Sequence, residues 1–228
     1  MIRLCVFDAY GTLFDVTAAA RETAREQEGE TLALHWRQIA ADWRQKQLQY
    51  TWIRAVSGTH ADFWQVTQDS LDWALEAAGL TAAPGLRERL LELYLELAAY
   101  PEVPEMLSRL KGAGLATAIL SNGSPGMLEA AVRSAGIGGE LDAVLSVERV
   151  GVFKPHASVY RMVPEHFGCA PDETLFVSSN GWDAAAAAGF GFRAVWVNRA
   201  GEPVDRLPWR PERILTDLGA IPQVAGEL

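Results

Sequence analysis

The chain has 228 residues, enough to bury a substantial core and to form one large domain or two small ones. Its 49% hydrophobic and 21% charged residues are typical of a globular protein, and no stretch reaches the roughly 18 apolar residues of a membrane helix. The formal net charge of −9 argues against nucleic acid and anionic membrane surfaces as partners.

The first predicted element is a short buried strand that ends at Asp8. Residues 4–7 (Leu-Cys-Val-Phe) are apolar and favour strands, and Gly11 breaks the pattern. Open parallel sheets present their chemistry at the carboxyl ends of strands, which is where Asp8 lies. Burying a carboxylate there is costly unless a cation or donors surround it. We therefore predict that Asp8 is a nucleophile; the alternative is that it caps the following segment.

The pattern then becomes helical and stays so until about residue 98. Glycine and proline separate the apolar periodic segments, and strand-like sequence resumes only after Pro101. We expect helices at residues 17–28, 32–54, 61–78 and 86–98. This block predicts a helical cap domain, residues 16–98, inserted into a core domain that comprises residues 1–15 and 99–228.

After the helical block, predicted strands and helices alternate. The strands are expected at residues 115–120, 141–147, 175–178 and 193–197, with a possible edge strand at 213–215, and the helices at 127–135, 158–167 and 183–188. Such alternation is typical of a parallel sheet with helices on both faces. The predicted fold class is α/β, a Rossmann-like doubly wound parallel core with an inserted α-helical cap.

Polar residues follow each predicted strand of the core. Residues 121–124 (Ser-Asn-Gly-Ser) place a hydroxyl and backbone N–H groups at a helix start, which suits an anion but also suits a simple N-cap. Lys154 follows the third strand; opposite Asp8 it would keep that carboxylate ionised, and otherwise it is a solvated loop lysine. Residues 178–183 (Ser-Ser-Asn-Gly-Trp-Asp) follow the fourth strand.

The segment Phe-Asp-Ala-Tyr-Gly-Thr-Leu-Phe-Asp at residues 7–15 resembles the first motif of the haloacid dehalogenase superfamily. Most of that superfamily has Asp-x-Asp, and the second Asp protonates a leaving alkoxide. Tyr10 stands at that position and cannot do this at neutral pH. A halide is a weak base and needs no proton, so the Asp-x-Tyr pattern is similar to that of the L-2-haloacid dehalogenases.

The motif after the fourth strand also departs from the superfamily phosphatases. They carry Gly-Asp-Ser-x-x-Asp there, and its first Asp ligates magnesium. Ser179 and Asn180 take the places of that Asp and of the following Ser. Too few carboxylates remain for a hard cation, which needs oxygen ligands and usually one or two carboxylates. We therefore expect neither a metal nor a cofactor.

The segment at residues 43–52 (Trp-Arg-Gln-Lys-Gln-Leu-Gln-Tyr-Thr-Trp) closely resembles the cap helix of the L-2-haloacid dehalogenases. A weakly hydrated guanidinium suits a halide leaving group, so the resemblance makes Arg44 the halide acceptor. The triplet Trp-Arg-Gln also occurs at residues 36–38, two helical turns earlier on about the same face. Spacing alone leaves Arg37 and Arg44 open, and only the longer match favours Arg44.

The resemblance implies a role for each motif. Asp8 attacks C2 of an L-2-haloalkanoate and displaces halide with inversion, and water then opens the aspartyl ester to give a D-2-hydroxy acid. The catalytic residues implied are Asp8, Thr12, Arg44, Lys154, Ser178, Asn180 and Asp183. The substrate-binding residues implied are Tyr10, Arg44, Gln45, Leu48, Phe63, Ser121, Asn122, Tyr160 and Trp182. Ser121 would bind the substrate carboxylate, and Asn122 would help to hold the halide.

The expected partners are thus a small anionic 2-haloalkanoate and its halide product, with a second copy of the chain as in many related enzymes. Cys5 and Cys169 lack the spacing of metal ligands and suit a reducing cytoplasm. Two alternatives are a phosphatase with unusual motifs, which Tyr10 and Ser179 argue against, and a non-catalytic binding protein. A site that keeps its reactive polar groups argues against the second.

Overall fold

The core of the computed structural model, which describes residues 1–26 and 34–228, is a six-stranded sheet in the order β3-β2-β1-β4-β5-β6. Every neighbouring pair of these strands is parallel. The strands are β1 (Leu4–Phe7), β2 (Ala116–Ser121), β3 (Ala143–Ser146), β4 (Thr174–Ser178), β5 (Arg193–Val197) and β6 (Arg213–Leu215). The predicted α/β class and its parallel sheet are confirmed.

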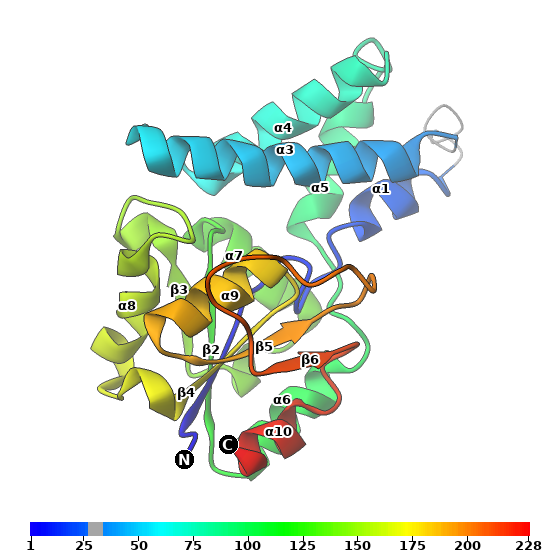
Figure 1. The fold of residues 1–228 in the computed structure, drawn as a ribbon. Helices are drawn as coiled ribbons and strands as arrows, with labels where there is room; N and C mark the ends of the chain where they lie inside the picture. The colour runs from blue at the N-terminus through cyan, green and yellow to red at the C-terminus, as the bar shows by residue number, and fades with distance from the viewer. Residues whose placement is uncertain (27–33) are drawn as a thin grey trace.

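Helices cover both faces of the sheet, and all but the last of them lie between strands in the chain (Figure 1). They are α6 (Val103–Gly112), α7 (Pro125–Ala135), α8 (Ala157–Phe167), α9 (Gly181–Phe190) and α10 (Ile221–Glu227). Right-handed crossovers place α6 and α7 on one face and α8 and α9 on the other. The central strand β1 is buried along its whole length, as its unbroken apolar sequence requires. Burial also raises the pKa of the Cys5 thiol in this strand to about 12.

Two of these helices, α6 and α10, were not predicted. The buried side chains of α6, Val103, Met106, Leu107 and Leu110, have helical spacing. Pro104 lies in its first turn, where the missing N–H costs no hydrogen bond. The prolines at residues 101 and 104 therefore mark the start of a helix rather than the end of helical structure. The α10 helix is short and also has a proline, Pro222, in its first turn.

In the described residues, four helices form a second layer above the carboxyl ends of the strands (Figure 1). They are α1 (Ala18–Thr23), α3 (Trp36–Ser57), α4 (Phe63–Ala77) and α5 (Leu86–Leu95). The helix predicted to continue through Glu28 ends at Thr23, and Glu28 itself lies outside the described residues. So does the predicted start of the next helix at Leu32. The longest of these four helices, α3, is followed directly by Gly58, whose left-handed backbone conformation caps the helix end.

The two connections between this helical layer and the core run side by side. Asp15 N donates to Ala98 O at 3.0 Å, and Tyr100 N donates to Leu13 O at 2.9 Å. The chain therefore leaves the core and returns to it at one place. On this basis we propose residues 16–98 as the cap domain and residues 1–15 and 99–228 as the core domain.

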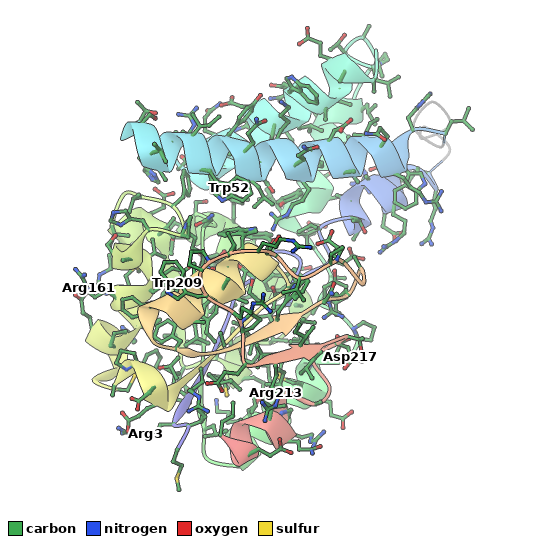
Figure 2. All side chains as sticks on the ribbon, in the orientation of Figure 1. Arg3, Trp52, Arg161, Trp209, Arg213 and Asp217 are labelled. Carbon is green, nitrogen blue, oxygen red and sulfur yellow. The ribbon has the colours of Figure 1, made fainter. Side chains whose placement is uncertain are left out.

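Side chains fill the interior of both layers, and charged ones such as Arg161, Arg213 and Asp217 extend from the surface of the core (Figure 2). Burying one large aliphatic or aromatic side chain stabilises a fold by roughly 1.5–3 kcal/mol. In the part of the chain that the structure describes, no helix is both long and apolar enough to cross a membrane.

Candidate active site

Four strands bring the predicted polar residues to one edge of the sheet. Asp8 directly follows β1, Ser121 and Ser178 end β2 and β4, and Lys154 lies in the segment after β3. The strand order reverses at β1. The chain first adds β2 and β3 on one side of β1 and later adds β4, β5 and β6 on its other side. Doubly wound sheets bind their ligands at such a reversal.

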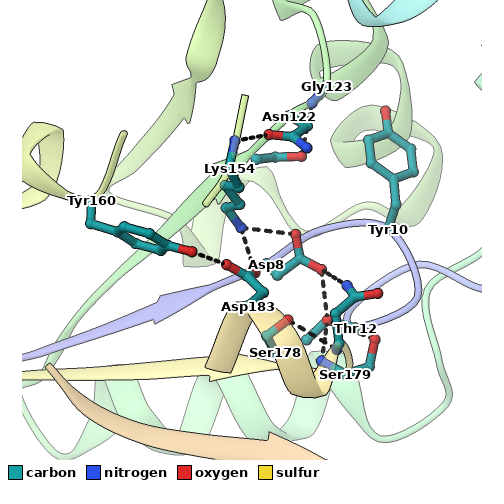
Figure 3. Close-up of polar contacts among 12 residues, drawn as sticks. Asp8, Tyr10, Thr12, Asn122, Gly123, Lys154, Tyr160, Ser178, Ser179 and Asp183 are labelled. Atoms are coloured by element: carbon teal, nitrogen blue, oxygen red, sulfur yellow. Dashed lines mark hydrogen bonds and ion pairs between the residues drawn. The ribbon is translucent and has the colours of Figure 1, made fainter. Parts of the chain in front are cut away.

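Lys154 joins the two acidic residues of this edge (Figure 3). Its Nζ donates to Asp8 Oδ1 at 3.1 Å and to Asp183 Oδ2 at 2.8 Å. Lys154 and Asp183 are 1% and 0% exposed, so solvent screens these ion pairs only weakly. The Tyr160 hydroxyl donates to the other oxygen of Asp183 at 2.6 Å. Asp183 is thereby fixed on both oxygens, and the ammonium is aimed at Asp8.

Burial and charge act in opposite directions on this cluster. Burial alone would lower the pKa of Lys154, but the carboxylates of Asp183 and Asp8 raise it, and the result lies above the ordinary value. Burial raises the pKa of Asp183, and Lys154 only partly offsets this. Burial, followed by the charge of Asp183, also raises the pKa of Tyr160 well above its ordinary value, so this phenol stays protonated and donates.

The second oxygen of Asp8 is held by two further donors. Oδ2 accepts from Thr12 Oγ1 and from Asn180 Nδ2, each at 3.0 Å. Ser178 Oγ accepts from the Asn180 backbone N–H at 3.1 Å and so orients that residue. The Thr12 hydroxyl also accepts from the Ser179 backbone N–H at 2.8 Å. Three side-chain donors thus fix the Asp8 carboxylate, as expected for a nucleophile whose orientation matters.

Arg44 reaches this edge from the cap helix α3. Its Nη2 donates to Tyr10 O and to Asn180 Oδ1, each at 3.2 Å, and its Nη1 donates to Gln47 Oε1 at 3.1 Å. Arg37, the arginine of the repeated triplet, is exposed and lies over the ring of Trp36 at 4.6 Å. Of the two arginines, the structure therefore brings only Arg44 to Asp8.

A small cavity of about 10 Å³ lies between the cap and the core, with room for about one water molecule. It is lined by Asp8, Tyr10, Arg44, Leu48, Phe63, Ser121, Asn122, Lys154, Asn180 and Trp182. Gln45 and Tyr160 were predicted to bind the substrate, but neither lines the cavity: Gln45 is exposed, and Tyr160 is buried and donates to Asp183 instead. One residue along a helix turns the side chain by about 100°, so a neighbour of Arg44 faces elsewhere.

The residues at the carboxyl end of β2 have hydrogen-bond donors that are free to bind an anion. Ser121 Oγ accepts from Gly123 N at 3.0 Å and so keeps its own proton to donate. Asn122 Oδ1 accepts from the Lys154 backbone N–H at 3.0 Å, which leaves its amide N–H₂ as donor. A side chain at Gly123 would come within 2.7 Å of the Tyr10 ring, so glycine is needed for this close approach.

A buried polar group behind Arg44 was missed by sequence reasoning. Gln47 is 1% exposed, and its Nε2 donates to Thr67 Oγ1 at 2.8 Å. Gln47 also contacts the Tyr94 hydroxyl, and the Tyr94 ring stacks on Tyr10 with centroids 5.7 Å apart. The available signal was its position three residues after Arg44, which places both side chains on one face of α3.

Lys154 Nζ already provides the cation between the two buried carboxylates of the site. Over residues 1–26 and 34–228, no three His, Cys, Asp or Glu side chains are grouped in a way that could hold a metal ion. Tyr10, at the position of the superfamily's proton donor, is buried, and burial with the nearby Tyr94 raises its pKa well above the ordinary value.

A doubly wound core, a helical cap and a strand-end aspartate paired with lysine define a haloacid dehalogenase-like hydrolase, and the model of that family matches residues 2–191. The chain is 42% identical over 224 residues to (S)-2-haloacid dehalogenase 1 of Pseudomonas sp. strain CBS-3, covering 98% of this chain and 96% of the relative. It is 43% identical over 202 residues to (S)-2-haloacid dehalogenase 4A of Burkholderia cepacia, covering 89% and 85%. The chain therefore belongs to the (S)-2-haloacid dehalogenase family, which confirms the resemblance seen in its motifs.

A solved structure supports the same assignment. The L-2-haloacid dehalogenase from Xanthobacter autotrophicus with chloropropionic acid covalently bound superposes with a TM-score of 0.87 at 37% identity, covering 100% of both chains. That enzyme thus carries a covalent adduct on a fold closely similar to this one.

Proposed function

We propose that the protein is an (S)-2-haloacid dehalogenase that hydrolyses short L-2-haloalkanoic acids to D-2-hydroxy acids. The observation that carries this proposal is the Asp8 carboxylate, which is fixed by Lys154, Thr12 and Asn180 and lines the same small cavity as Arg44. The named activity of the relatives and the covalent adduct of the Xanthobacter enzyme support it.

In the first step an oxygen of Asp8 attacks C2 from the face opposite the halogen. The C–O bond forms as the carbon–halogen bond breaks, and the configuration at C2 inverts. The departing halide takes the negative charge toward the guanidinium of Arg44 and the amide N–H₂ of Asn122. Because the cavity has room for only about one water molecule, these donors act on the developing charge with little competition from water.

The substrate carboxylate is assigned to the opposite end of the cavity. The Ser121 hydroxyl donates to it, and the backbone N–H groups at the start of α7 add to the attraction. The apolar side chains of Leu48, Phe63 and Trp182 line the rest of the cavity. These local donors and cations draw in an anion despite the net charge of −9.

In the second step water attacks the carbonyl carbon of the Asp8 ester. The acyl–oxygen bond breaks, the hydroxy acid leaves with a proton from that water, and one water oxygen remains on the restored Asp8. Asp183 does not line the cavity; it holds the ammonium of Lys154 beside Asp8 and through it orients the water. Tyr160 holds Asp183 in place by donating to it.

The test of the proposal is halide release from the two enantiomers of 2-chloropropionate. We expect release of chloride from the L enantiomer alone, with D-lactate as the organic product, measured by chloride titration and chiral chromatography. Release from neither enantiomer, or preference for the D form, would contradict the proposal.

Chelation is expected to leave this activity unchanged. Lys154 supplies the positive charge beside Asp8, and a monocarboxylate substrate attacked at carbon needs no divalent ion to cancel its charge. Chloride release should therefore be the same in excess EDTA as in added magnesium. Loss of turnover in EDTA that magnesium restores, with phosphate released from an aryl phosphate, would favour the phosphatase alternative.

Replacing Gln47 by leucine is expected to lower turnover about tenfold, roughly 1.4 kcal/mol. Arg44 loses its Gln47 acceptor and is held less well in the halide position. Halide product inhibition should weaken with it, an effect that a merely less stable protein would not show. The control is Gln45→Leu, at the exposed neighbouring position, which should match the wild type. Equal damage from both changes would contradict the positioning role of Gln47.

We also propose, from the resemblance, that the enzyme is a cytoplasmic homodimer. Leu86 and Leu90 of α5, and Leu97 just beyond its end, are buried within the chain, so this face serves core packing. Light scattering should give a mass of about twice the 24.9 kDa of the chain.

A further inference from the structure

Arg199 lies just beyond the carboxyl end of β5, in a turn that is closed by its neighbour. The Asn198 backbone N–H donates to Leu215 O at 2.7 Å. The Asn198 side chain accepts from Glu202 N and donates to Glu202 O, each at 2.9 Å. Because β5 is parallel to the other strands, this turn places Arg199 at the same edge of the sheet as Asp8.

The guanidinium of Arg199 contacts both connections between the core and the cap. Its Nη2 donates to Thr12 O, in the outgoing connection, at 3.2 Å and pairs with Glu102 Oε1, just beyond the returning connection, at 2.7 Å. Its Cζ lies 3.6 Å from the centroid of the Tyr100 ring. A planar guanidinium can stack on a ring and form an ion pair at the same time, so this group is held from three sides.

The ion pair of Arg199 with Glu102 is itself well supported. Their side chains are 22% and 24% exposed, so solvent screens the pair less than it screens an ion pair on the open surface. Glu102 Oε1 also accepts from the Leu218 backbone N–H at 3.4 Å. The carboxylate that holds Arg199 is therefore fixed to the carboxyl-terminal part of the core.

Thr12 connects this cluster to the nucleophile. Its hydroxyl donates to Asp8 Oδ2 at 3.0 Å and accepts from the Ser179 backbone N–H at 2.8 Å. The preceding residue, Gly11, has a φ of 88°, which gives the loop a point of easy rotation. A contact from outside the loop is therefore needed to keep Thr12 in one orientation, and Arg199 supplies it at the Thr12 carbonyl.

We infer that Arg199 is a positioning residue: by holding Thr12 O it keeps the Thr12 hydroxyl on Asp8 and so orients the nucleophile for attack on C2. The inference rests on the proposed function. Arg199 does not line the catalytic cavity, so it acts through Thr12 and not on the substrate. A poorly oriented nucleophile slows displacement, whereas substrate binding by Ser121 and Arg44 is unaffected.

The first experiment measures displacement as chloride released from L-2-chloropropionate in a single turnover. Arg199→Met should slow it about tenfold and leave KM within about twofold of the wild type. The matched control is Arg193→Met. Arg193 begins β5, at the opposite edge of the sheet, and pairs with Glu212 at 2.6 Å, so it also loses an arginine–glutamate pair. Equal slowing in the two variants would overturn the inference.

Two milder variants keep the test valid if Arg199→Met folds poorly. Arg199→Lys retains a cation beside Glu102 and should recover part of the displacement rate. Glu102→Gln keeps an acceptor for Arg199 but removes its charge, and should slow displacement about threefold without changing KM. If either variant raised KM and left displacement unchanged, the positioning role would be wrong.

A double variant tests the route through Thr12. Thr12→Val removes the hydroxyl that Arg199 is inferred to position, so adding Arg199→Met to it should slow displacement by less than about twofold more. A role for Arg199 that is independent of Thr12 would make the two effects multiply. A further loss of about tenfold in the double variant would therefore overturn the inference.

Hydrogen exchange followed by NMR gives a readout that needs no substrate. The Ser179 amide, which donates to Thr12 Oγ1, should exchange at least about tenfold faster in Arg199→Met and at the wild-type rate in Arg193→Met. Unchanged exchange in Arg199→Met would overturn the inference and leave the proposed function intact. Absence of chloride release from the wild type would instead overturn the proposed function, and the exchange rates would still decide whether Arg199 holds Thr12.

Discussion

Asp8→Asn is expected to abolish both halide release and ester formation, with at least a 10⁴-fold loss of turnover, or about 5.5 kcal/mol. The amide has nearly the shape of the carboxylate but lacks the negative charge that attacks C2. Lys154 would keep Asp183 as a partner, so the fold should survive. The measurements are chloride release and intact-protein mass after incubation with L-2-chloropropionate.

Asp183→Asn separates the two steps of the same reaction. Displacement needs the Asp8 carboxylate and the halide acceptor, whereas hydrolysis also needs a water oriented by Asp183 and Lys154. We therefore expect hydrolysis to slow more than displacement. About one chloride per protein should be released, and mass spectrometry should find an adduct on the peptide that contains Asp8. Normal turnover, or an adduct on another residue, would show that the two roles are wrongly assigned.

Arg44→Ala is expected to lower turnover at least a hundredfold, on the order of 3 kcal/mol. The guanidinium lies at the cavity, in contact with Tyr10 O and Asn180 Oδ1, and its loss leaves the departing halide without its main cation. Arg44→Lys should recover part of the activity, because the charge is kept while the planar, weakly hydrated donor is lost. The readout is chloride release under saturating and limiting substrate.

The control for Arg44 is the arginine of the repeated triplet. Arg37 is exposed and stacks on Trp36, so Arg37→Ala should remain within about twofold of the wild type. Equal damage from the two substitutions, or greater damage from Arg37→Ala, would mean that the arginine facing the halide has been wrongly chosen.

The sequence predicted the core more fully than it predicted the cap side of the site. Buried parallel strands have unbroken apolar sequence, and their carboxyl ends must meet, so the positions of Asp8, Ser121 and Ser178 followed from the pattern. The pairing of Lys154 with Asp8 joins residues 146 positions apart, and no local pattern determines it. Only the resemblance suggested it in advance.

Helical phase explains the error at Gln45. The α3 helix has buried residues such as Trp43 and Gln47 and also packs over the core, so its sequence lacks a clean division into apolar and polar faces. In the segment Arg-Gln-Lys-Gln only the spacing from Arg44 separates the two glutamines: Gln47 lies three residues on, on the same face, and Gln45 is the adjacent residue. The packing of α3 on α4, through Gln47 and Thr67, then fixes Gln47 inward.

The paired connections at residues 13–15 and 98–100 have a consequence for how such enzymes diversify. Because the two ends of the helical insert meet, recombination at those junctions can exchange the insert while β1 stays continuous with the core. Arg44, Leu48 and Phe63 would travel with the insert, whereas Asp8 and Lys154 would remain behind. Under the proposed mechanism, the main cation for the leaving halide would then be exchanged separately from the residues that attack C2 and open the ester.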